Sequence, residues 1–420
     1  MTVPATKGTG KRPSLWRNRE FVALWSGQVI STLGTQISGT AMPLLVLATT
    51  GSPSDAGLVG AAGTLPFLLG HLPAGPLVDR WNRRKILLVS QLVAGLALST
   101  VPIAMWLGVF TIAHLAVAAF VQGMCFVFFG LAERAALPLI VPASLLPTAI
   151  AHNEARSRGA ALIGPPLGGM LFGLGRAVPF VADAVSFLIA SVGMLFIRSD
   201  LQSRTTKPVE SLWQATTAGL RWIWRHPFIR AAVVLIAVSN LVFHALILII
   251  VVLAQHHGAT PTDIGTMLGI YSGGGLVGAL AASKLHHHFT PKAVIIGVNW
   301  IWAALLPLFV LTSSPLVIGV IGAASAFVGP LWNVVIISYT TLLVPNELLG
   351  RVMSAAMTLS WGVMPLASVG AGLLLTTIGP TSSVLVLSAL MLITAVAATA
   401  SPALRHAPPL PAHDEVLGGR

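Results

Sequence analysis

Residues Gly75 to Lys85 read GPLVDRWNRRK and place four basic side chains at the six positions from Arg80 onward, between two long apolar runs. The contrast is unusual because the 420-residue chain is 55% hydrophobic and only 9% charged. Soluble domains have about a quarter charged residues. The composition therefore excludes an ordinary soluble domain, and it indicates that this basic stretch is a turn between two membrane-spanning helices.

The apolar runs along the chain are long enough to cross about 30 Å of hydrocarbon, which takes about 20 residues as a helix. Only helices and closed barrels satisfy every backbone polar group in lipid, and the short alternating segments of a barrel are absent from the sequence. The sequence thus predicts an all-α membrane protein of twelve transmembrane helices, separated by proline, glycine and charged residues. The expected spans are residues 21–48, 55–78, 86–108, 111–133, 150–174, 178–198, 229–254, 262–285, 291–312, 315–339, 349–377 and 381–400.

These spans predict five regions along the chain. The regions are an N-terminal tail (1–20), a six-helix bundle (21–198), a linker (199–228), a second six-helix bundle (229–400) and a C-terminal tail (401–420). In the linker, Leu212, Thr216, Leu220 and Ile223 recur at helical spacing, which favours an amphipathic helix at the membrane surface. This helix is either a spacer or a regulatory element.

The distribution of positive charge predicts the orientation, because short loops rich in Lys and Arg stay in the cytoplasm. With both termini cytoplasmic, every one of the 24 Lys and Arg residues except Arg176 lies on the cytoplasmic side. The apolar run from Phe21 to Leu47 is too long for the core of a signal peptide, so we expect a retained first helix. The expected location is the inner or plasma membrane of the cell, with many crossings.

The two halves resemble each other weakly. One alignment pairs Asp55 with Asp263 and Gly57 with Gly265. A second pairs LIVPASLL, which starts at Leu139, with LLVPNELL, which starts at Leu342. Both fall at corresponding places, which predicts two pseudo-symmetric bundles. Secondary transporters are built this way and bind substrate near the midplane between the repeats.

The basic turn resembles the loop after the second helix in the major facilitator superfamily, which runs G-x-L-x-D-R-x-G-R-[RK]. The matching residues are Gly75, Leu77, Asp79, Arg80, Arg83 and Arg84. Asn82 replaces the usual glycine, and asparagine is one of the few residues that enter the left-handed backbone region at low cost. The resemblance implies two pseudo-symmetric six-helix bundles in the major facilitator fold.

Further segments narrow the resemblance. GAALIGPPLGG, from Gly159 to Gly169, is similar to a motif of the antiporter branches of that superfamily. GLRWIWRHP, DAVSF and VPNELLGRVMS resemble the branch with macrolide efflux pumps and the enterobactin exporter. The resemblance implies a drug:proton antiporter that works by alternating access.

The same family motif implies a cytoplasmic gate. In the family its aspartate contacts the start of the eleventh helix and an arginine at the end of the fourth helix, where Arg134 lies in this chain. We expect Asp79 and Arg134 to form a latch that keeps the outward-facing state closed to the cytoplasm. The gate as a whole comprises Gly75, Asp79, Arg80, Arg83, Arg84 and Arg134. The alternative is that the loop only anchors the topology.

Small residues in the fifth span predict close helix packing. The residues of this antiporter motif are Gly159, Gly164, Pro165, Gly168 and Gly169. The eighth span offers a complementary set, namely Gly265, Gly269 and Gly273, then Gly274, Gly278 and Ala282. Either this contact is packing alone, or it is also a seal that limits leakage.

Proton coupling has few candidate residues, because none of the twelve acidic residues falls near the centre of a span. Related exporters often carry an aspartate after the glycine of LGD in the first helix, where this chain has Thr35. The remaining candidates are Asp183 and His244, each of which has a structural hydrogen bond as its alternative role. Candidates for the substrate cavity are Gln36, Gln122, Asn240, Asn333 and Trp361; each alternatively joins two helices.

We therefore expect a secondary active transporter that exports small amphipathic or hydrophobic molecules, such as drugs, antibiotics or secondary metabolites. An importer or an uncoupled facilitator of the same fold is the alternative, and a non-transporting sensor or scaffold is a further one. No nucleophile, base or metal set converges, so no enzyme is expected, and the sequence has no nucleotide-binding G-x-x-x-x-G-K-[ST] loop. The expected partners are the lipid bilayer, the substrate and protons, with no cofactor, metal or nucleic acid, and the chain is expected to be a monomer.

Overall fold

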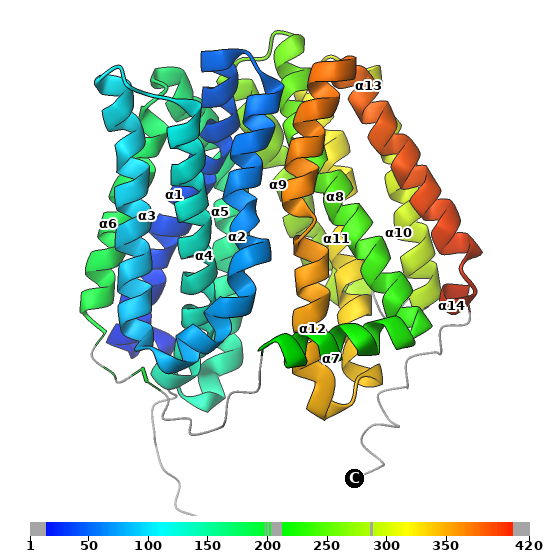
Figure 1. The fold of residues 1–420 in the computed structure, drawn as a ribbon, viewed down its shortest axis with the longest axis horizontal. Coiled ribbons are helices and arrows are strands. Elements are labelled where there is room, and N and C mark those ends of the chain that lie inside the picture. Colours follow the sequence, from blue (N-terminus) through cyan, green and yellow to red (C-terminus); the bar gives the residue numbers. More distant parts are fainter. Residues whose placement is uncertain (1–13, 198, 200, 203–211, 286–288, 406–420) are drawn as a thin grey trace, which may run out of the picture.

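The computed structural model describes residues 14–197, 199, 201–202, 212–285 and 289–405, and these are helical almost throughout. The first six long helices form one bundle, and six further helices form a second bundle beside it (Figure 1). The first bundle contains α1 (Arg19–Thr50), α2 (Pro53–Arg80), α3 (Arg83–Trp106), α4 (Ile112–Ile140), α5 (Leu146–Leu174) and α6 (Val178–Leu195). The second contains α8 (Pro227–His256), α9 (Pro261–Leu285), α10 (Pro291–Leu305) with η3 (Leu306–Leu311), α11 (Pro315–Leu343), α12 (Asn346–Trp361) and α13 (Met364–Ala400).

Nine of the helices in the described part of the chain are long and apolar enough to cross a membrane, or ten when the bent α2 is included. One of the nine stretches, Leu348–Ala400, has 53 residues and breaks at Gly379, whose φ is 77°. At 1.5 Å per residue it is long enough for two crossings. Helix α5, which carries Arg156 and Arg158, is not among the nine but packs along α1 and α9. The layout fits the twelve-helix fold predicted from the sequence.

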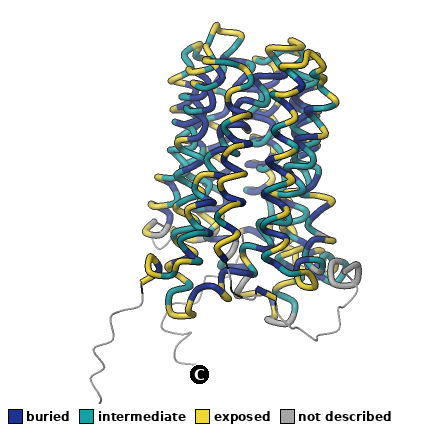
Figure 2. The backbone as a smooth tube through the Cα atoms, turned by 90° about the vertical axis from the view of Figure 1, so that its left-hand side faces the viewer, coloured by how far each residue is buried: buried dark blue, intermediate teal, exposed yellow. Residues whose placement is uncertain are grey.

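The outer surface of the bundles is apolar. Leu96, Val117 and Ile393 are more than half exposed, and exposed positions recur along the whole length of the helices (Figure 2). An exposed apolar surface of this extent has to face lipid rather than water.

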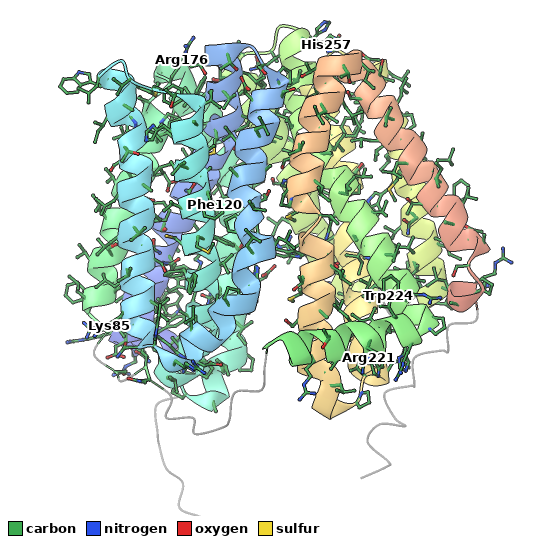
Figure 3. All side chains as sticks on the ribbon, viewed as in Figure 1. Lys85, Phe120, Arg176, Arg221, Trp224 and His257 are labelled. Carbon is green, nitrogen blue, oxygen red and sulfur yellow. The ribbon has the colours of Figure 1, made fainter. Side chains whose placement is uncertain are left out.

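Arginine, lysine and histidine side chains mark the two ends of the helices. Lys85 and Arg221 lie at one end, Arg176 and His257 at the other, and Phe120 midway between them (Figure 3). The end with Lys85 and Arg221 is called the basic end below, and the opposite end the far end.

The linker helix α7 (Leu212–Arg225) lies across the basic end of the second bundle (Figure 1). It packs on α12, and Gly219 allows this approach because an added Cβ would collide with the backbone of Arg351. Ile223 is buried against α8 and α12, whereas Trp224 and Arg225 are exposed. The helix is amphipathic as the sequence predicts, although the linker residues 203–211 and the tails 1–13 and 406–420 lie outside the described residues.

The two bundles meet through their far-end halves. Helix α5 packs on α9, and α2 packs on α13. Glycine allows both crossings: Gly169 faces Gly265 with no room for a Cβ, and Gly57 faces Gly372 in the same way. The two alignments of the sequence halves pair Gly57 with Gly265 and Gly169 with Gly372. The two crossings are therefore equivalent under the pseudo-symmetry of the fold.

Two local expectations were wrong. The eleventh span is not one helix: it is interrupted between Trp361 and Met364, and after Met364 the chain continues as α13 through the bend at Gly379. Asn82 does not enter the left-handed region either. Its backbone is extended (φ −63°, ψ 113°), and its side chain caps α3 by accepting a hydrogen bond from the Lys85 amide. Asparagine suits this turn because it is a good N-cap.

Candidate functional site

Asp183 lies at the centre of a polar cluster inside the first bundle. It is fully buried on α6 and accepts hydrogen bonds from the Ser38 hydroxyl of α1 at 2.5 Å and from the Gln122 amide of α4 at 3.3 Å. Ser186 donates to its other carboxylate oxygen at 3.0 Å. No ion pair joins Asp183 to a basic residue within the described ranges. The cluster is therefore a buried carboxyl group held by neutral donors from three helices.

Gly34 makes room for this cluster. A Cβ at Gly34 would collide with the Asp183 carboxylate and the Ser186 hydroxyl. The next residue, Thr35, turns its hydroxyl to the Ser31 carbonyl of its own helix at 3.0 Å. Gly34 of the LGT stretch thus leaves space for Asp183 on the neighbouring helix, and the Thr35 side chain takes no part in the cluster.

His244 lies near the contact between the two bundles. Its Nε2 atom is 3.0 Å from the Ser368 hydroxyl, which joins α8 to α13. Ser368 in turn packs against Gly57 and Gly60 of α2 in the first bundle. The expected hydrogen bond of His244 to another helix is present, and its partner belongs to the surface that closes the far end.

A cavity of about 190 Å³ lies within the second bundle. Its wall is aromatic and neutral, with Asn240 and Asn333 of the predicted cavity residues among its members. Helices α8, α9, α10 and α11 supply the lining residues Ile236, Ser239, Asn240, Phe243, Tyr271, Trp302, Ser325, Ala326, Gly329, Trp332 and Asn333. Asn240 also donates to the Ser360 carbonyl of α12 at 2.8 Å, which fixes its amide at the edge of the cavity.

The other predicted cavity residues lie elsewhere. Gln36 is half-buried, with its Cβ against Gly164, and Gln122 binds Asp183 as described above. Trp361 is 39% exposed and packs edge-on against Phe67 of α2. None of these three lines the cavity in the second bundle.

The residues of the basic turn tie several helix ends together. Arg83 is buried, lies 3.6 Å from the Asp79 carboxylate and donates to the carbonyls of Ala135 and Leu201. Arg84 donates to the Leu195 carbonyl at 3.0 Å. Arg80 is exposed at the end of α2, and the Gly75 backbone has open space around its Cα. The turn therefore anchors the ends of α2, α4 and α6.

No ion pair joins the expected latch partners, Asp79 and Arg134, in the part of the chain that the structure describes. The Asp79 side chain is 68% exposed and is paired with Arg83, and Arg134 is exposed on α4. Glu133, next to Arg134, forms a bidentate ion pair with Arg156 of α5, whose two guanidinium nitrogens lie 2.9 and 3.3 Å from the carboxylate oxygens. Glu154 pairs with Arg158 at 2.8 Å. Both glutamates thus bind arginines of α5.

The glycines of the antiporter motif face different neighbours. Gly169 and Pro165 contact Gly265 of α9, and Pro166 contacts Gly269. Gly164 and Gly168 instead face α1 at Gln36 and Ile37, and Gly159 has open space. On α9, Gly274 and Gly278 face α11 rather than α5. The glycines and prolines of the motif therefore pack α5 against two helices, α1 on one side and α9 on the other.

Several residues at these sites were missed by the sequence reasoning. Ser38 and Ser186 lie within the Asp183 cluster, and Tyr271 and Trp302 line the cavity. The feature of the sequence that could have identified them is a hydroxyl or aromatic N–H group within an apolar span, because such a group needs a hydrogen-bond partner there. No group of three His, Cys, Asp or Glu residues suited to a metal ion exists among the described residues, and the run His286 to His288 lies outside them.

Two bundles of membrane-spanning helices that are closed at one end and joined by a surface helix define a multi-pass membrane transporter. The sequence model of the Major Facilitator Superfamily matches residues 24–361, and a second match covers residues 232–416. The chain belongs to this superfamily.

Efflux pumps are among the relatives of the chain. The multidrug efflux pump Tap of Mycolicibacterium fortuitum is 28% identical over 399 residues, which cover 92% of this chain and 95% of the relative. Macrolide efflux protein A of Streptococcus pyogenes is 23% identical over 180 residues, 43% of this chain and 44% of the relative. The solved structure of the nucleoside transporter NupG superposes with a TM-score of 0.74 at 11% identity, over 91% of this chain and 98% of that chain, a likeness of fold alone.

Proposed function

We propose that the protein exports small amphipathic or hydrophobic molecules across the plasma membrane by alternating access, driven by protons that enter in exchange. The observation that carries the proposal is the match to a multidrug efflux pump over almost the full length of both chains. A partly aromatic, partly polar cavity is typical of sites for such compounds. The protein works as a monomeric transporter in the bilayer, without a cofactor, and it is not an enzyme.

We place the basic end and both termini in the cytoplasm, following the distribution of Lys and Arg. In that orientation the far-end contacts of α5 with α9 and of α2 with α13 seal the outer face, so the described conformation faces inward. An exposed Asp79 agrees with this state, because its latch with Arg134 is needed only when the cytoplasmic side closes.

Asp183 and His244 are the proposed proton carriers. Ionisable groups inside a bilayer are costly and usually functional. Among the described residues Asp183 has three neutral donors and no basic partner, so no ion pair cancels its charge there. His244 has one hydroxyl partner at the surface where the bundles meet. Proton binding at either group changes the hydrogen bonds that hold neighbouring helices together.

A second candidate function is import or facilitated passage without proton coupling. The observation in its favour is Thr35, whose hydroxyl is used by its own helix, at the position where related exporters often carry an acid. The two functions differ in their dependence on a proton gradient.

Efflux measured in everted membrane vesicles tests the proposal. A panel that includes a macrolide and ethidium is offered with and without a protonophore. We expect the vesicles to accumulate the compounds, and we expect the protonophore to abolish this accumulation. The Asp183→Asn variant should not accumulate them, whereas Glu154→Gln, which changes an exposed ion pair, should accumulate them as the parent does. Concentrative accumulation that survives the protonophore would exclude proton antiport, and equilibration alone would establish the facilitator.

A further inference from the structure

The cavity in the second bundle contains a buried hydroxyl group that lacks a partner. Ser239 on α8 is 5% exposed, and its Oγ atom forms no hydrogen bond within the described residues. Leaving such a group unsatisfied costs about 1–3 kcal/mol. Ser239 is among the residues that line the cavity, so a ligand there that reaches its hydroxyl would supply the missing hydrogen bond.

Aromatic side chains form the rest of the wall and are held in place. The Trp302 indole N–H donates to the Ser325 carbonyl at 2.8 Å, which fixes the ring and leaves no donor for a ligand. Its ring centroid lies 4.8 Å from Phe243 at an interplanar angle of 65° and 6.2 Å from Trp332 at 48°. Fixed, tilted rings present faces and edges against which another aromatic ring packs favourably.

Helix α11 adds polar groups close to the cavity. Pro330 has no N–H, so the carbonyl of Ala326, four residues earlier, loses its helical donor. Ala326 belongs to the cavity lining, as does Asn333, which is exposed. The site thus combines an aromatic wall with several hydrogen-bonding groups.

The size and charge of the cavity define the ligand further. An apolar cavity of about 150 Å³ holds one benzene ring, so about 190 Å³ suits a group of one ring or two fused rings. None of the described lining residues is acidic or basic, and an unpaired charge is expensive to bury. We propose that this cavity is a binding site for neutral, planar aromatic molecules of one or two rings that carry a hydroxyl or amide group, recognised by the Ser239 hydroxyl.

This proposal rests on the proposed function, because it names a substrate class for the exporter. It places the site inside the second bundle.

Calorimetric titration of the full chain in nanodiscs tests the site, with empty nanodiscs as the blank. The probes are 2-naphthol, naphthalene, which lacks the hydroxyl, and the naphthyltrimethylammonium cation. We expect saturable binding of 2-naphthol, weaker binding of naphthalene and still weaker binding of the cation. Ser239→Ala should weaken the binding of 2-naphthol about fivefold, which corresponds to the loss of one neutral hydrogen bond. The binding of naphthalene should not change. A purely structural role of Ser239 would shift both probes equally.

A cavity-filling variant provides a second arm. A Cβ at Gly329 would meet only Trp302, at 3.9 Å, so a larger side chain fits there and fills the cavity. Gly329→Val should weaken both naphthalene probes more than tenfold. Gly297→Val on α10, where a Cβ meets nothing within 4 Å, is the matched control and should change neither.

The site is disproved if 2-naphthol gives the same heat as empty nanodiscs, or if Gly329→Val binds it as the parent does. Tighter binding of the cation than of 2-naphthol would show that the site takes cations, contrary to the proposal. Binding is measured without transport, so the two proposals can fail separately. If 2-naphthol does not bind but vesicles export other compounds, the site is disproved and the exporter stands. Binding without export of any compound would uphold the site and refute the exporter.

Discussion

Replacing Gly169 by alanine should open the far end of the transporter. An added Cβ at Gly169 would collide with the Pro261 carbonyl and lie 3.0 Å from the Gly265 Cα atom. Both neighbours are backbone atoms of α9, which cannot move aside as a flexible side chain would. The collision is relieved only when α5 and α9 separate, and these helices belong to different bundles.

The size of the effect follows from this geometry. Carbon atoms are in favourable contact at about 3.5–4.0 Å, so α5 and α9 must move apart by about 0.5–1 Å. Overpacking of this kind costs about 1–3 kcal/mol. The cost applies only to the conformation in which the far end is closed, so the ratio of that conformation to the outward-open one should fall by about 5- to 150-fold.

Paired spin labels at the basic end measure the shift. Lys85 and Gly350 are exposed there on opposite bundles, and the single native cysteine, Cys125, is first replaced by alanine. In the parent we expect a population of long label distances, and in Gly169→Ala a transfer to shorter distances as the basic end closes. Gly173→Ala is the matched control, since its Cβ meets only the Thr262 hydroxyl at 3.6 Å.

Identical distance distributions in Gly169→Ala and Gly173→Ala would contradict the expected coupling between the far-end crossing and the basic end. A drop in thermal stability without a change in distances would mean that the first bundle deforms internally instead. The symmetry-related variant Gly57→Ala must act in the same direction, because its Cβ would lie 2.5 Å from the Ser368 carbonyl and 3.0 Å from Gly372.

Two further outcomes can be checked on the same preparations. Glu133→Gln breaks an ion pair whose side chains are 13% and 9% exposed, so it should lower the free energy of unfolding in detergent by about 3 kcal/mol. Arg158→Gln breaks an exposed pair and should lower it by less than about 1 kcal/mol. Equal melting points for the two variants would refute this difference in stability. Asp79→Asn should leave the inward-facing conformation intact, since Asp79 is mostly exposed there. It should reduce the outward-facing population that the labels on Lys85 and Gly350 report. Unchanged label distances would reject the latch.

The spans and their symmetry could be predicted because they depend on local and repeating patterns. Apolar runs of sufficient length have no soluble alternative, and the linker helix follows from the spacing of Leu220 and Ile223. The weak internal repeat proved informative in one respect. The glycines that it aligns, Gly57 with Gly265, lie at the two crossings where the bundles leave no room for a Cβ.

Helix rotation could not be predicted, and this explains the misplaced residues. Hydrophobic periodicity is weak in a helix that is apolar on all sides, so the neighbour of each face stays undetermined. For this reason Gly164 and Gly168 were expected at α9 but face α1, and Gln122 was expected in a cavity but binds Asp183. Asn240 and Asn333 line a cavity, although their role in binding substrate stays a prediction, and the neighbouring rings of Tyr271 and Trp302 come from helices distant in sequence.

The positions of the sites constrain how transport and proton movement are coupled. Asp183 is buried in the first bundle, and the aromatic cavity lies within the second, so a bound molecule there cannot compete directly with a proton on Asp183. Coupling between them has to pass through the contacts that join the bundles. His244 lies close to this surface, because its partner Ser368 packs on Gly60 of the opposite bundle. If the carriers are as proposed, Asp183 acts by changing the packing of α1, α4 and α6, whereas His244 acts at the far-end seal itself.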